Sequence, residues 1–173
     1  MAGFVLALLL AGSTPGPAAT PGWTVESLPA NGPELLAAGV QSAGGDRLYL
    51  WARHRSGRHQ VFAQLQLAEG TAFAGRMPVY RIDDSPPYDT DQIRRAGDAR
   101  GSLWGDVSKQ VAFWLVWASN EDVIRPGDPL DAWLAGKRLQ VSFRADDGTD
   151  HSIEFTLEGA AGAVLSATGL KRE

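Results

Sequence analysis

Two alternating segments near the end of the chain constrain its fold more than any other feature. Apolar and polar side chains alternate along residues 138–144, and they alternate again along residues 151–158. The sequence Asp146-Asp147-Gly148-Thr149 between them is typical of a turn. A period of two on both sides of a turn predicts an antiparallel β-hairpin. Its apolar residues would share one core face: Leu139, Val141, Phe143, Ile153, Phe155 and Leu157.

Earlier runs of aromatic and branched residues predict further strands. One begins at Trp23, and the others cover residues 47–52, 61–67 and 78–83. The polar segment 54–59 predicts a hairpin turn between the second and third of these strands. Residues 111–117 are nearly all apolar, which predicts a central strand buried on both faces and places Trp114 and Trp117 in the core.

Two short segments have the pattern of a helix. Residues 128–136 begin with Asp and Pro and end with Gly, and residues 159–168 carry apolar side chains at helical spacing before Gly169. Several antiparallel strands with one or two short helices predict a mainly β fold, an antiparallel β-sandwich-like single domain. We expect this domain to cover residues 23–170, with 171–173 as a tail.

The first 22 residues predict export. The apolar run 4–11 is too short for a membrane-spanning helix but has the length of a signal-peptide core. Small residues and prolines follow it, so we expect a signal peptide and flexible linker over residues 1–22, with cleavage near Ala18 or Ala19. No Lys or Arg precedes the run. The expected location is periplasmic or secreted, without a stable membrane span.

Several kinds of chemistry are disfavoured by the composition. The chain has no cysteine, which removes thiolate nucleophiles and iron–sulfur ligation. A formal net charge of −4 argues against a nucleic-acid partner. Arginines surround His54 and His59, and residues 146–150 lack the spacing of a calcium loop. We therefore expect no cofactor, no metal site and no catalytic residue among the common motifs.

The strand 78–83 and the polar segment 85–99 after it form the candidate interaction site. Arg81 and Asp83 would project to the surface, while Tyr80 would face the other way. One interpretation is an Arg81–Asp83 ion pair that pins the loop. The other is a binding patch of Tyr80, Arg81, Asp83 and Trp104, in which Arg81 contacts an acidic or aromatic group on a partner.

Two classes of function follow from these features. We favour an exported, non-enzymatic binding or accessory module that contacts another protein of the envelope or of a secretion system. The alternative is a small glycan-acting hydrolase using Asp83 or Asp84, which would need two carboxyl groups in different environments across a cleft.

Five short segments also carry a family resemblance. They are residues 79–83, Trp104, 113–115, 136–141 and 153–160. In this order the chain resembles small exported bacterial proteins, namely the type VI secretion accessory proteins of the VasI/TagO kind and, more distantly, the invasion-associated locus B family. The resemblance implies a periplasmic β-rich domain without recognised catalytic machinery. The chain differs from these families in lacking their usual cysteines.

Overall fold

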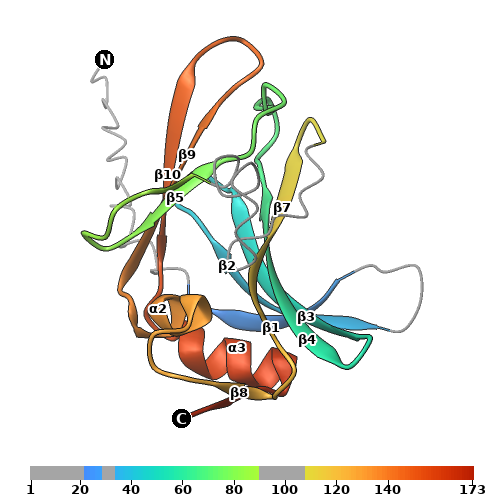
Figure 1. Cartoon of the computed structure of the whole chain (residues 1–173). Helices are drawn as coiled ribbons and strands as arrows, with labels where there is room; N and C mark the ends of the chain where they lie inside the picture. The colour runs from blue at the N-terminus through green and yellow to red at the C-terminus, as the bar shows by residue number, and fades with distance from the viewer. Residues whose placement is uncertain (1–21, 29–33, 90–107) are drawn as a thin grey trace, which may run out of the picture.

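The computed structural model describes residues 22–28, 34–89 and 108–173. The predicted signal peptide and Trp104 lie outside these ranges. Within them the chain forms a single small, mainly β domain with antiparallel sheets and two short helices, as the sequence predicts (Figure 1). The apolar run at residues 4–11 is likewise outside the described part, in which no helix has the length and apolar character needed to cross a membrane.

Two sheets make up most of the domain. The first has five strands in the order β1 (Thr24–Leu28), β2 (Leu35–Gln41), β3 (Arg47–Arg55), β4 (Arg58–Gln66) and β7 (Val111–Ser119). The second has four strands in the order β10 (Asp150–Thr156), β9 (Arg138–Arg144), β5 (Val79–Ile82) and β6 (Tyr88–Asp89). Neighbouring strands in both sheets are antiparallel.

The hairpin predicted from the alternating segments is confirmed. Strands β9 and β10 pair with Val141 opposite Ile153 and Leu139 opposite Phe155. Leu139, Val141 and Phe155 are buried, and Ile153 packs against the same core. The period-two pattern therefore identifies the core face of this sheet correctly.

The core lies between the facing surfaces of the two sheets (Figure 1). Tyr80 of β5 contacts Trp114 of β7 across the layers, with ring centroids 5.9 Å apart. Phe73 and Phe143 make an edge-to-face contact at 4.9 Å. The predicted core tryptophans Trp114 and Trp117 are both buried.

Both predicted helices are present. Helix α2 (Pro129–Ala135) buries Leu130, Trp133 and Leu134, and α3 (Ala160–Thr168) packs against β2 and β3. Gly169 ends α3 with a left-handed backbone conformation (φ 70°), and its N–H donates to the Leu165 carbonyl. Glycine is favoured at this position because other residues are strained there.

The position of β7 in the sheet differs from the central position that its apolar sequence predicts. Its two faces are largely buried, but it is the last strand of the described five-stranded sheet rather than a central one. Burial comes from side chains above and below the sheet, so an apolar run does not reveal whether a strand has one neighbour or two.

Four strands were not expected from the sequence, and one of them, β6, lies in the predicted surface loop 85–99. Strand β2 contains Ala37, Ala38 and Gly39, whose small side chains give no alternating signal. Lys171 and Arg172, expected in a tail, form β11 (Lys171–Arg172) and pair in parallel with β8 (Val123–Ile124). The Lys171 ammonium lies 2.9 Å from the Asp122 carboxylate and lowers its pKa.

The turn between β3 and β4 is shorter than predicted. His54 and His59 are paired strand residues, which leaves only Ser56 and Gly57 in the turn. Both have positive φ, 52° and 74°. A two-residue hairpin turn with positive φ at both positions favours Asn followed by Gly.

Ser56→Asn is expected to raise the free energy of unfolding by about 0.5 kcal/mol, because asparagine tolerates positive φ better than serine. Ser56→Val should lower it, since a branched side chain is strained in this conformation. Urea unfolding of both variants measures the difference. The same effect from both substitutions would contradict this account of the turn.

Candidate binding site

A pocket of about 810 Å³ lies between the β5–β6 hairpin and the carboxyl end of α2. The hairpin contributes the segment from Ile82 to Asp89, and α2 contributes Ala132, Ala135 and the following Gly136. Most of the exposed lining is apolar, and the aspartates of the hairpin supply the acidic groups. A concave, mainly apolar surface with a few polar groups is the usual form of a ligand site.

Asp83 fixes the hairpin to the rest of the domain. Its side chain accepts hydrogen bonds from the backbone N–H groups of Lys137 (3.2 Å) and Arg138 (3.0 Å). Its own N–H donates to the Arg138 carbonyl at 2.9 Å. Asp83 has a positive φ of 48°, which aspartate tolerates better than most residues.

The predicted Arg81–Asp83 ion pair does not form. The Asp83 carboxylate is held by backbone amides, and no carboxylate of the described residues lies within ion-pair distance of Arg81. A continuous strand would place both residues on one face, but β5 ends at Ile82 and the chain turns at Asp83.

Asp84 has a different environment. Its side chain is fully exposed and lies 4.0 Å from the Arg138 guanidinium, which also approaches Glu154 at 3.8 Å. A glycosidase needs a carboxyl group that stays protonated, usually inside an apolar enclosure. Neither Asp83 nor Asp84, the two candidates, has such an enclosure, because Asp83 accepts amide hydrogen bonds and Asp84 is in solvent.

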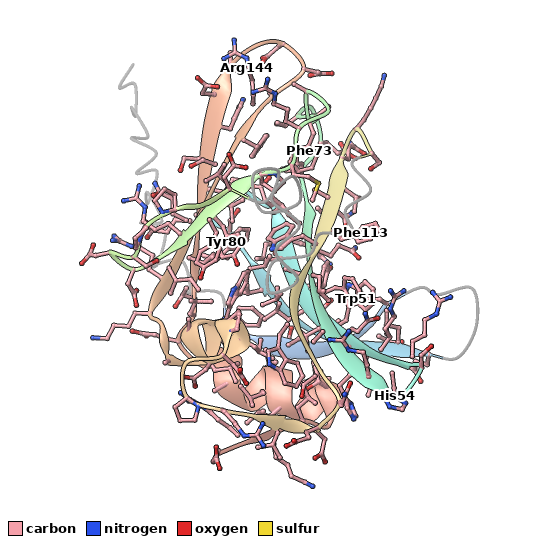
Figure 2. The ribbon with its side chains drawn as sticks, viewed as in Figure 1. Trp51, His54, Phe73, Tyr80, Phe113 and Arg144 are labelled. Carbon is pink, nitrogen blue, oxygen red and sulfur yellow. The ribbon has the colours of Figure 1, made fainter. Side chains whose placement is uncertain are left out.

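An aromatic stack connects the pocket to the core. Tyr88 of the lining is 43% exposed, and its ring lies parallel to Tyr80 with centroids 5.2 Å apart. Tyr80 is only 6% exposed and also contacts Trp114 and Trp133. Burial raises the pKa of the Tyr80 phenol above its usual value. Figure 2 shows Tyr80 beneath the β5–β6 hairpin.

The structure brings together only part of the residue set predicted from the sequence. Asp83 lines the pocket, Tyr80 lies behind Tyr88, and Arg81 is exposed outside the lining. Trp104 is outside the described residues. Tyr88 is not in the predicted set. Its position directly after Pro86-Pro87, within the predicted surface loop, could have identified it as an exposed aromatic residue.

The other acidic and histidine-containing segments show no metal-binding arrangement among the described residues. Asp147 accepts hydrogen bonds from the N–H and hydroxyl of Thr149, which lower its pKa and close the β9–β10 turn. Across the described ranges, no three His, Asp or Glu side chains come together in a way that could hold a metal ion.

Comparison of the chain with family models, with curated proteins and with solved structures finds no match.

Asp83→Ala is expected to lower the free energy of unfolding by about 2 kcal/mol, because two backbone amides lose a charged acceptor. Alanine is also less favourable at positive φ. Asp83→Asn should recover part of the loss, and Asp84→Ala should leave stability nearly unchanged. Equal losses from Asp83→Ala and Asp84→Ala in urea unfolding would contradict the anchoring role.

Gly136 is expected to be required for the close approach of α2 to β5. A Cβ atom there would lie 2.5 Å from Ile82 Cγ2 and 3.0 Å from the Ala132 carbonyl oxygen. Gly136→Ala should therefore cost about 1–3 kcal/mol of stability.

Gly162 of α3 is the matched control, because a Cβ atom at this position would have no neighbouring side chain within 4 Å. Gly162→Ala should stabilise the domain by about 0.5–1 kcal/mol through helix propensity. Thermal unfolding compares the two variants, and a neutral Gly136→Ala would show that α2 does not need this close contact.

Proposed function

We propose that this chain is an exported, non-enzymatic binding module that uses the β5–β6 pocket to contact another protein of the cell envelope or of a secretion system. The observation that carries the proposal is the exposed Tyr88 ring beside an apolar pocket on a firmly anchored hairpin. Exposed aromatic side chains on rigid supports are frequent anchors of protein interfaces.

The anchoring of the hairpin supports a role in recognition. Asp83 ties it to the start of β9, and Tyr88 stacks on the buried Tyr80. A ligand that packs on Tyr88 therefore meets a surface that is already ordered, which reduces the entropy lost on binding. Pro86 and Pro87 restrict the backbone of the same lining further.

Export is supported by the sequence. The apolar run 4–11 and the small residues after it have the pattern of a signal peptide. The resemblance to exported bacterial accessory proteins of the VasI/TagO kind is consistent with the same location, and it suggests a partner in the envelope or in a secretion system. Arg81 remains a second contact of the proposed interface, because its side chain is exposed on β5.

The hydrolase alternative has weaker support. Asp83 and Asp84 do line one pocket, as such an enzyme would require. However, the Asp83 carboxylate accepts two structural hydrogen bonds and Asp84 is fully exposed. The pair lacks the contrast between an apolar and a polar carboxyl environment that assigns acid and base roles.

A photo-crosslinking amino acid tests the proposal directly. Benzoylphenylalanine in place of Tyr88 keeps an aromatic ring at the site and should crosslink a specific periplasmic or membrane-associated protein in the native cells. The same amino acid in place of Leu36 is a matched control, because Leu36 is 44% exposed and lies outside the pocket on β2.

Equal crosslinking from both positions, or a crosslinked partner confined to the cytoplasm, would contradict the proposal. Once the partner is identified, Tyr88→Ala should weaken its binding by about tenfold or more. Glycan cleavage by the purified chain that disappears in Asp84→Asn would instead establish the hydrolase.

A further inference from the structure

The tip of the β3–β4 hairpin carries a cluster of basic side chains. Arg53, Arg55 and Arg58 lie on the outer face of the sheet, and His54 and His59 lie opposite each other on the other face with ring centroids 4.7 Å apart. Arg55 and Arg58 are exposed. Figure 2 shows His54 at this tip, on a different side of the domain from Tyr80.

The three arginines of the tip lie together without a carboxylate partner among the residues that the structure describes. No Asp or Glu of the described residues lies within 4.0 Å of Arg53, Arg55 or Arg58. Other arginines of the domain do have such partners: Arg47, Arg125, Arg138, Arg144 and Arg172. Within the described part of the chain, the positive charge at the tip is therefore not balanced locally.

The pairing of β3 with β4 increases this imbalance. Arg55 lies directly opposite Arg58, and like charges in that position destabilise a hairpin. The carboxylates of the adjoining β7–β8 turn are already paired, since Glu121 contacts Arg125 and Asp122 contacts Lys171. The Arg55–Arg58 pair therefore lowers the stability of the free domain, and a bound anion would remove this repulsion.

Aromatic side chains continue the same outer face. The Arg53 guanidinium lies 4.7 Å from the Phe62 ring centroid, and the partly exposed Trp51 stacks on Phe62 at 4.6 Å. Phe62 is buried and the Trp51 Nε1 atom is covered, so this face offers part of the Trp51 ring beside the arginines. Guanidinium groups bind the phosphates of lipid headgroups, and tryptophan is enriched where proteins meet the membrane surface.

We propose that the β3–β4 tip binds the surface of a membrane containing anionic phospholipids. The tip projects from the sheet, as Figure 1 shows, and a projecting hairpin suits a flat surface better than it encloses a small anion. A nucleic acid would require a basic stripe that follows successive phosphates, whereas the cluster is confined to one hairpin end. This inference is independent of the pocket and its proposed partner.

Sedimentation with lipid vesicles tests the inference on the full chain. Binding is expected to phosphatidylcholine vesicles that contain about one-third phosphatidylglycerol, and not to pure phosphatidylcholine vesicles, and it should weaken as salt is raised. The double variant Arg55→Gln/Arg58→Gln should bind about 30-fold more weakly, given the usual contribution of each basic residue near an anionic surface.

The double variant Arg144→Gln/Arg172→Gln is the matched control. It changes the net charge by the same amount, but its arginines are paired with Asp150 and Asp131 and lie on other elements. The control should keep vesicle binding. The Arg55/Arg58 variant should fold normally, because its substitutions relieve a like-charge pair, and its thermal midpoint checks this.

Three results would overturn the inference. They are equal binding to neutral and anionic vesicles, equal loss in the two double variants, and binding of a DNA duplex or a polyglutamate peptide in the absence of any vesicle binding. Inorganic phosphate at the concentration of the lipid headgroups should not compete. Competition by phosphate would indicate a small-anion site instead of a membrane surface.

Discussion

The stacking of Tyr80 against aromatic side chains of three other elements is the interaction on which the rest of the structure depends. Its ring contacts Trp114 of β7, Trp133 of α2 and Tyr88 of β6. These contacts join the two sheets and the helix at one point, and buried aromatic rings contribute strongly to such packing. Through these contacts Tyr80 joins β6 and α2, both of which line the β5–β6 pocket, and Gly136 allows α2 to approach β5 closely.

Much of the fold could be predicted from local patterns. The β9–β10 hairpin and both helices follow from periodicity and from turn residues that act within a few positions of the chain. The edge position of β7 and the pairing of β11 with β8 could not be predicted this way, since they depend on which distant segments become neighbours. Strand β2 was missed because alanine and glycine carry little periodic signal.

Only the part of the site that lies in one short segment, from Asp83 to Pro87, could be predicted from the sequence. Asp83 and the proline segment were expected at a candidate surface, and both line the pocket. The proposed pairing with Arg81 was wrong because the competing donors, the amides of Lys137 and Arg138, are 54 and 55 residues away in the chain. The contribution of α2 was missed for the same reason. The contacts of Asp83 depend on where β5 ends and on the return of residues 137 and 138 to this point of the fold. The spacing of side chains along one segment shows neither of these.

Charge is distributed unevenly over a chain whose formal net charge is −4. Aspartates lie along the β5–β6 pocket, whereas Arg53, Arg55 and Arg58 lie at the β3–β4 tip without a carboxylate partner among the described residues. Figure 1 shows these two hairpins on different sides of the domain, one in each sheet. Because charges farther apart than about 8 Å are largely screened at physiological salt, each surface interacts with its own surroundings rather than with the net charge. If the tip contacts an anionic membrane, as we propose, this separation leaves the pocket open to the proposed protein partner.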